Sequence, residues 1–221
     1  MHPLSTRIKT EFLKLRNESQ AAGMAAYMKK LFPFLGIKTP VRRALIRKLN
    51  AEAHLASFSE LKVVLEELWS LDEREFQYAA MDLLQLHKKK WNDKLHDLVE
   101  SLITRKSWWD SVDCLASSVY GAFLLKNRIF PEDQLDRWLE SPDMWLNRSA
   151  IIFQLSHKDK TNPVFLEKAI ARHIASPEFF IQKAIGWALR QYARTHPEFV
   201  IKITGKYPLK PLSRREALKR L

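Results

Sequence analysis

The residue best suited to chemistry in this sequence is an aspartate that follows two tryptophans. Asp113 ends the string Ser107-Trp108-Trp109-Asp110-Ser111-Val112-Asp113, and Trp109 precedes it by four residues, which places both side chains on one helical face. A carboxylate there could stabilise a developing positive charge or orient a water molecule. The pattern alone favours a structural role, as a salt bridge to Arg148 or a helix cap. Asp110 also fits a structural role, because negative charge is favourable near a helix start.

A second helical face combines an aromatic residue with cations. Lys183, Trp187, Arg190 and Arg194 recur at helical spacing, with apolar residues on the opposite side. Aromatic rings amid charges can stack on a base or attract a cation, although core packing is the alternative for Trp109 and Trp187. We expect the other five tryptophans to pack between helices: Trp69, Trp91, Trp108, Trp138 and Trp145.

The balance of charge favours a polyanionic partner. Lys and Arg number 37 against 25 Asp and Glu, so the formal net charge is +12. A groove lined by cations binds phosphates without reading sequence, whereas scattered surface cations only keep a protein soluble. The candidates for phosphate contacts are Arg42, Arg43, Arg47, Arg148, Lys158, Lys183, Arg190, Arg194, Arg214 and Arg215.

Composition excludes several other classes of protein. Only five residues are glycine, which argues against sheet folds and phosphate-binding loops, and the single cysteine, Cys114, excludes a disulfide or a multi-thiolate zinc site. The seven histidines lack metal-binding spacing, so we expect no metal and no cofactor. The start of the chain lacks a signal peptide, and no apolar run could span a membrane. We therefore expect a soluble protein of a reducing compartment such as the cytoplasm.

The scarcity of glycine favours an all-α chain, and prolines and predicted caps divide it into about a dozen helices. Four residues that precede prolines, Thr39, Ser141, Asn162 and Ser176, are predicted N-caps, and Ser57 with Glu60 predicts a capping box. The expected helices cover 4–16, 19–32, 40–50, 58–70, 73–87, 92–105, 108–125, 132–140, 143–156, 163–175, 177–194, 197–204 and 213–221.

An interval of 35 residues recurs along the chain. It separates Arg43, Tyr78, Asp113, Arg148 and Lys183, and small residues follow each of them. Two helices per interval are typical of a solenoid of HEAT or TPR type, and the absence of the TPR signature favours HEAT-like stacking. We expect one such domain over residues 1–221.

At these positions the sequence resembles the AlkD family of bacterial DNA alkylation repair glycosylases from end to end. The most specific strings are S-W-W-D-S-V-D at 107–113 and F-F-I-Q-K-A-I-G-W at 179–187. Further matching stretches lie at 27–40, 66–76, 148–155 and 211–217.

The resemblance implies a C-shaped solenoid with a basic concave face that binds duplex DNA as a monomer. It implies hydrolysis of the N-glycosidic bond of N3- or N7-alkylated purines, such as 3-methyladenine and 7-methylguanine, without flipping the base into a pocket. Trp109, Asp113 and Trp187 match the active-site cleft, and Arg148 matches an arginine that contacts the DNA backbone and supports catalysis. The DNA contacts implied are Tyr27, Lys38, Thr39, Arg43, Arg47, Lys158, Lys183, Arg190, Ser213 and Arg214.

Two other functions remain open from the residues alone. A non-catalytic HEAT-like module for binding nucleic acid would carry the same basic residues, but would give Asp113 no reason to share a face with Trp109. A protein–protein scaffold is the third possibility, for which a charge of +12 is high.

Overall fold

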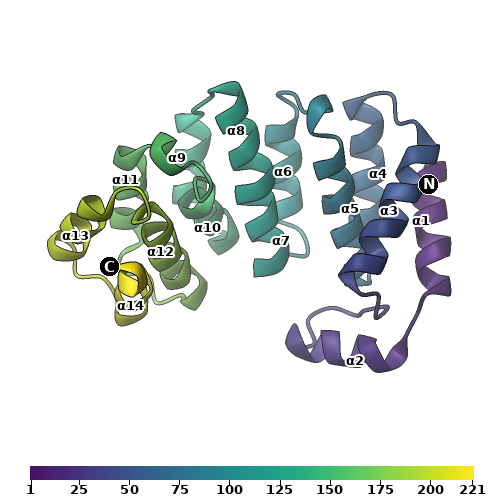
Figure 1. Ribbon diagram of the computed structural model, residues 1–221, viewed down its shortest axis with the longest axis horizontal. Helices are drawn as coiled ribbons and strands as arrows, with labels where there is room; N and C mark the ends of the chain where they lie inside the picture. Colours follow the sequence, from purple (N-terminus) through teal and green to yellow (C-terminus); the bar gives the residue numbers. More distant parts are fainter. The chain divides into compact units, whose positions relative to one another are not determined.

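The computed structural model describes residues 1–221, and it is helical throughout, without a β-strand (Figure 1). The all-α prediction is therefore confirmed. The chain divides into two compact units, Met1–Lys94 and Leu95–Leu221. The expectation of one domain over both units stays a prediction. None of the helices combines the length and the apolar character that a membrane span requires.

The first unit contains five α-helices, of which all but α2 bury an apolar face. They are α1 (Pro3–Lys14), α2 (Glu18–Tyr27), α3 (Thr39–Ala53), α4 (Phe58–Ser70) and α5 (Arg74–Leu86), followed by a 3₁₀ turn, η1 (Lys88–Lys90). Helix α1 packs against α3 and α4, and α5 packs against α3 and α4. Phe12 and Phe76 stack in the core, with ring centroids 5.6 Å apart.

The second unit contains the two strings that carry the candidate chemistry. Its α-helices are α6 (Leu95–Ile103), α7 (Trp109–Asp113), α8 (Ala122–Asn127), α9 (Glu132–Glu140), α10 (Met144–Ile152), α11 (Pro163–His173), α12 (Phe179–Tyr192), α13 (Pro197–Lys206) and α14 (Pro211–Ala217). Helix α10 packs against α9, α11 and α12, and α12 packs against α13 and α14. The other helical segments are a π-helix, η2 (Cys114–Gly121), and two 3₁₀ turns, η3 (Lys158–Lys160) and η4 (Leu218–Arg220).

The helix expected over 108–125 is continuous, but its middle is π-helical. It runs through α7, η2 and α8. A Cβ added at Gly121 would lie 1.9 Å from the carbonyl oxygen of Phe153, so only glycine allows this approach to the end of α10. The carbonyl of Gly121 accepts a hydrogen bond from Nε2 of the buried His157, at 2.9 Å. The π-helix that follows Asp113 is thus anchored from the neighbouring helix pair.

Amide side chains give the 35-residue interval a structural meaning. Asn147 lies 35 residues before Gln182 and twice that distance after Gln77. The Gln77 amide donates to carbonyls at the end of α4, and the Asn147 amide donates to carbonyls at the end of α9. Gln182 donates to the carbonyls of Ser176 and Pro177, just beyond α11. Each amide therefore donates to backbone carbonyls at or just beyond the end of the preceding helix, as expected of a helical repeat.

Two of the predicted N-caps are confirmed. Asn162 accepts a hydrogen bond from the backbone N–H of Phe165, and Ser57 accepts one from that of Glu60. The Glu60 carboxylate reaches back to the N–H of Ala56, one residue earlier than a capping box requires.

The other three predicted caps are wrong. Ser141 and Ser176 each accept the N–H two residues further on, which forms a turn, so α10 and α12 begin later, with Asp143 and Glu178 as N-caps. Thr39 is already the first residue of α3, and Lys38 is its N-cap.

Candidate active site

Asp113 and Arg148 form a bidentate ion pair. The guanidinium Nε and Nη2 atoms of Arg148 donate to the two carboxylate oxygens of Asp113, at 2.7 and 2.8 Å. The salt bridge that the sequence offered as a structural role for Asp113 is therefore confirmed. It joins the last residue of α7 to the middle of α10, one repeat interval further along the chain.

Arg148 is held on its other side by the backbone of α12. Its Nη1 atom donates to the carbonyl oxygen of Phe180 at 2.6 Å, and its side chain is 5% exposed. Because a guanidinium has five N–H donors, these three bonds leave two donors for another partner. The predicted contact of Arg148 with a DNA phosphate stays a prediction, and these two N–H groups are the ones that could make it.

Burial sets the titration of Asp113. Its side chain is 17% exposed, and burial raises the pKa of its carboxyl above the ordinary value, because the charged form loses water. The hydrogen bonds and charge of Arg148 oppose this rise, while the nearby Asp110 adds to it. Asp113 is thus a largely buried carboxylate with one tightly held partner.

Asp113 and Trp187 line the same cavity. This cavity, which we call the Asp113 pocket, has a volume of about 370 Å³ and is open to solvent. Its other lining residues are Cys114, Ser117, Ser118, Leu155, Ser156 and Gln191. The structure thus brings together an acid from α7, a tryptophan from α12 and, through the ion pair, an arginine from α10.

Trp109 lies beside this arrangement without lining the cavity. It is the first residue of α7, one turn before Asp113, and it is half-buried. Its predicted place in an active-site cleft stays a prediction.

The other tryptophans pack between helices, as expected. Trp69 and Trp138 are buried in the core, and the Nε1 of Trp91 donates to the carbonyl of Leu84. Trp108, Trp145 and Phe180 form a cluster with ring centroids 5.0 to 5.7 Å apart. The backbone carbonyl of Phe180 also accepts the hydrogen bond from Arg148, so this aromatic cluster is connected to the Asp113–Arg148 ion pair.

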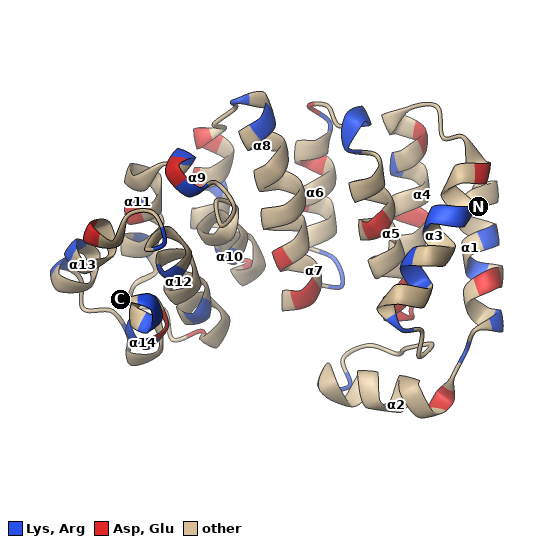
Figure 2. Cartoon of the chain, viewed as in Figure 1, with Lys and Arg blue, Asp and Glu red and all other residues tan.

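Several of the expected DNA contacts are tied to acidic partners. Lys183 and Arg190 both reach the carboxylate of Glu216 in α14, at 3.3 and 2.5 Å. Glu216 is buried, and its hydrogen bond to Lys219, together with Lys183, lowers its pKa to about 2. Figure 2 shows basic residues on α12 and α14 of this unit. The role of Glu216 as a partner of these cations was not predicted from the sequence. The one sign of it there is an acidic residue inside the basic segment 214–220.

Two more expected contacts in the second unit make structural hydrogen bonds. The buried Ser213 hydroxyl donates to the carbonyl of Gln182, and Arg214 donates to the carbonyl of Thr204 while remaining exposed. Lys158 is exposed and forms no ion pair.

The first unit carries the remaining expected contacts. Arg43 shares the carboxylate of Asp82 with the buried Arg42, at 3.1 and 2.9 Å. Arg47 lines a small cavity beside this pair and forms no ion pair itself. Tyr27 at the end of α2 is 71% exposed, and Lys38 and Thr39 are exposed at the start of α3.

Comparisons with known proteins agree with one another. A family model described as DNA alkylation repair enzyme matches residues 8–221. A solved structure described as a predicted DNA alkylation repair enzyme from Enterococcus faecalis is similar to this chain, with a TM-score of 0.85 and 36% sequence identity. The match covers 93% of this chain and 96% of that one. No functionally curated protein matches the chain.

Proposed function

The chain belongs to the family of DNA alkylation repair enzymes, and from this premise we propose that it is a monofunctional DNA glycosylase. Its substrates are cationic N3- or N7-alkylated purines in duplex DNA, such as 3-methyladenine and 7-methylguanine, and it begins base excision repair by hydrolysing their N-glycosidic bond. The observation that supports this proposal best is the placement of Asp113 and Trp187 on one cavity. The 35-residue helical repeats, which we assign to the HEAT type, position these residues.

Cleavage of this glycosidic bond needs a carboxylate near the sugar more than it needs an acid that protonates the base. An alkylated N3 or N7 purine already carries a positive charge, so it leaves without protonation. The deoxyribose acquires oxocarbenium character as the bond breaks, and a carboxylate fixed beside it lowers the energy of that state. Because the Asp113 side chain is mostly buried, its charge acts more strongly than it would in water. The same carboxylate can orient the attacking water.

Arg148 and the tryptophans have supporting roles in this mechanism. Arg148 is a positioning residue, because its bidentate bond fixes the plane of the Asp113 carboxylate. Its two remaining N–H groups can bind the phosphate next to the lesion. Trp187 excludes water on the far wall of the cavity, and Trp109 packs against the sugar. Selectivity then follows from the charge of the leaving group more than from the shape of a base pocket.

Excision of an alkylated base from duplex DNA tests the proposal directly. We expect the protein to produce alkali-labile abasic sites in DNA that contains 7-methylguanine. Asp113→Asn should keep DNA affinity and slow single-turnover excision by roughly 100- to 1000-fold, the usual effect of removing one electrostatic stabiliser.

Asp133→Asn on the exposed first turn of α9 is the matched control and should excise at the wild-type rate. If Asp113→Asn excises the base at the wild-type rate, the Asp113–Arg148 ion pair has only a structural role. DNA binding by the wild-type protein without any abasic product would favour the non-catalytic nucleic-acid-binding module.

A further inference from the structure

One amide side chain, that of Gln191, lines the Asp113 pocket. Gln191 lies one turn of α12 after Trp187, so the two side chains share a face of that helix. The residue is half-buried, and its amide has no hydrogen-bond partner in the protein. None of the roles proposed for Asp113, Arg148 and the tryptophans uses this amide.

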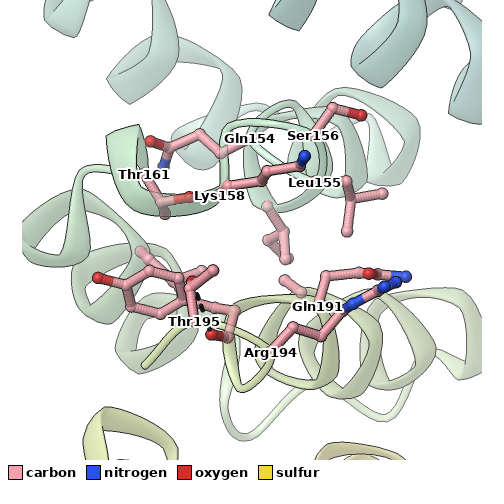
Figure 3. Close-up of a pocket in the computed structure, with 12 residues that line it drawn as sticks. Gln154, Leu155, Ser156, Lys158, Thr161, Gln191, Arg194 and Thr195 are labelled. Carbon is pink, nitrogen blue, oxygen red and sulfur yellow. Dashed lines mark hydrogen bonds between the residues drawn. The ribbon is translucent and has the colours of Figure 1, made fainter. Parts of the chain in front are cut away.

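Gln191 also lies where the Asp113 pocket adjoins a larger cavity. This cavity has a volume of about 450 Å³ and lies between the segment that links α10 to α11 and the C-terminal half of α12 (Figure 3). Leu155, Ser156 and Gln191 line both cavities, and Figure 3 shows the first two on the wall that faces α12. A water molecule that moves between the two cavities therefore passes the Gln191 amide.

A water molecule that attacks the sugar needs two hydrogen-bond acceptors to be fully oriented. One of its O–H groups points to the Asp113 carboxylate, whose oxygens keep lone pairs beyond those that bind Arg148. With that bond alone the water still rotates, so its own lone pair faces the C1′ carbon of the deoxyribose only part of the time. A second acceptor, for the other O–H, fixes the direction of the attacking lone pair.

Gln191 is the side chain of the pocket best suited to be that second acceptor. Leu155 has no polar atom in its side chain, and the indole of Trp187 can only donate. A hydroxyl both donates to water and accepts from it, so the serines of the pocket do not enforce one orientation: Ser117, Ser118 and Ser156. The oxygen of an amide only accepts, and the unpartnered amide of Gln191 is free to turn its oxygen toward the water.

We propose that Gln191 holds the attacking water together with Asp113, its Oε1 accepting the O–H that Asp113 does not; the inference rests on the proposed glycosylase function. The N-glycosidic bond breaks with its electron pair moving to the cationic purine, which leaves as a neutral base. The water oxygen bonds to C1′, and one proton passes to the Asp113 carboxylate. The second O–H becomes the hydroxyl of the abasic sugar and keeps its bond to Gln191. Because the amide is neutral, it does not offset the negative charge that Asp113 presents to the sugar.

Competition between methanol and water for the sugar tests this role. Methanol has one O–H for Asp113 and a methyl group where water has its second O–H, so the wild-type protein should disfavour it. In Gln191→Met an apolar side chain of similar length faces that methyl group. In single turnovers at one methanol concentration, we expect the ratio of methyl glycoside to abasic product to rise about fivefold over the wild-type ratio, as for the loss of one hydrogen bond between neutral groups.

Alkali separates the two products. It cleaves DNA at an abasic site and leaves the methyl glycoside intact. The amount of 7-methylguanine released in excess of alkali-labile sites therefore measures capture by methanol. If Gln191 only packs in the wall of the pocket, its replacement changes how much base is released and leaves this ratio unchanged.

Three further variants complete the comparison. Gln191→Glu keeps an acceptor in the same place and should keep the wild-type ratio at a pH where the new carboxyl is ionised. Gln191→Ala removes the acceptor with a smaller side chain and should raise the ratio as Gln191→Met does, so the test does not depend on the folding of one variant. Gln20→Met in α2 makes the same replacement at another half-buried glutamine whose amide oxygen lacks a partner, and should leave the ratio unchanged.

The failure of this role is distinguishable from the failure of the glycosylase function. If Gln191→Met and Gln191→Ala release the base and keep the wild-type ratio, Gln191 does not hold the water, and the glycosylase function stands. If the wild-type protein releases no base, the glycosylase function is wrong and the role of Gln191 falls with it.

Discussion

At the scale of single residues, the ionisation of Asp113 should control the rate of excision. Burial raises the pKa of this carboxyl, and only the ionised form can stabilise a positive sugar. Asp113 therefore becomes protonated at a higher pH than an exposed aspartate does. Excision activity should be lost as the pH falls through that raised pKa. Single-turnover excision of 7-methylguanine, measured as a function of pH, should show this acid limb.

Replacing Arg148 supplies the control for that pH profile. Arg148 opposes the rise in the pKa of Asp113, so Arg148→Gln should move the acid limb to higher pH as well as slow the reaction. A purely structural arginine would change the rate or the stability and leave the position of the limb unchanged. An acid limb at the same pH in both proteins would therefore contradict the assignment of Asp113.

Trp187 should affect the reaction more than binding. Most affinity for DNA comes from phosphates, whereas Trp187 lines the cavity beside Asp113. We expect Trp187→Ala to slow excision of 7-methylguanine more than that of the labile 3-methyladenine, which needs less assistance to leave. Trp109→Ala should act in the same direction. The measurements are the single-turnover excision rates for both lesions and the affinity for an abasic analogue. If both variants excise 7-methylguanine at the wild-type rate, the two tryptophans only pack in the core and take no part in the reaction.

At the scale of elements, Gly121 is where the segment carrying Asp113 meets the end of α10. A methyl group at this position would collide with the carbonyl oxygen of Phe153, and a backbone atom cannot move aside cheaply. Gly121→Ala should lower the free energy of unfolding by about 1–3 kcal/mol, the usual cost of overpacking. Gly205→Ala in α13 meets nothing within 4 Å and should change stability little or raise it by at most about 1 kcal/mol. Urea denaturation of the two variants makes the comparison, and equal stabilities would contradict it.

The elements were predictable where local signals decide the structure. Each α-helix overlaps a predicted segment, with α7 and α8 inside the one segment 108–125, and the cap at Asn162 followed from its side chain and the next proline. The predicted caps at Ser141 and Ser176 were wrong because a serine side chain can either cap a helix or close a turn before it. The sequence does not distinguish these two roles. The π-helix after Asp113 was not predicted, and it ends at Gly121, where a residue far along the chain, Phe153, comes close.

The sequence predicted which residues lie near Asp113 better than it predicted which acidic residues pair with the cations. The 35-residue interval placed Asp113 and Arg148 at equivalent positions and offered their ion pair as one alternative, which the structure confirms. The partners of the basic residues were missed, because Glu216 and Asp82 reach their cations only through tertiary packing.

At the scale of the whole molecule, a net charge of +12 matters only through the cations that acids leave free. Arg47 is such a cation, because Asp82 beside it is already shared by Arg42 and Arg43. Affinity for undamaged duplex should therefore fall steeply with salt, with a log–log slope of several units.

Arg47→Gln should make that slope shallower by about 0.9, the contribution of one phosphate contact. Arg172→Gln removes the same charge from an exposed arginine that is bonded to Glu140, so it alters the overall charge equally and should leave the slope unchanged. Titrations of a labelled duplex between 50 and 200 mM salt compare the two variants. If both lower the slope alike, the protein attracts DNA through its total charge, and Arg47 makes no contact of its own.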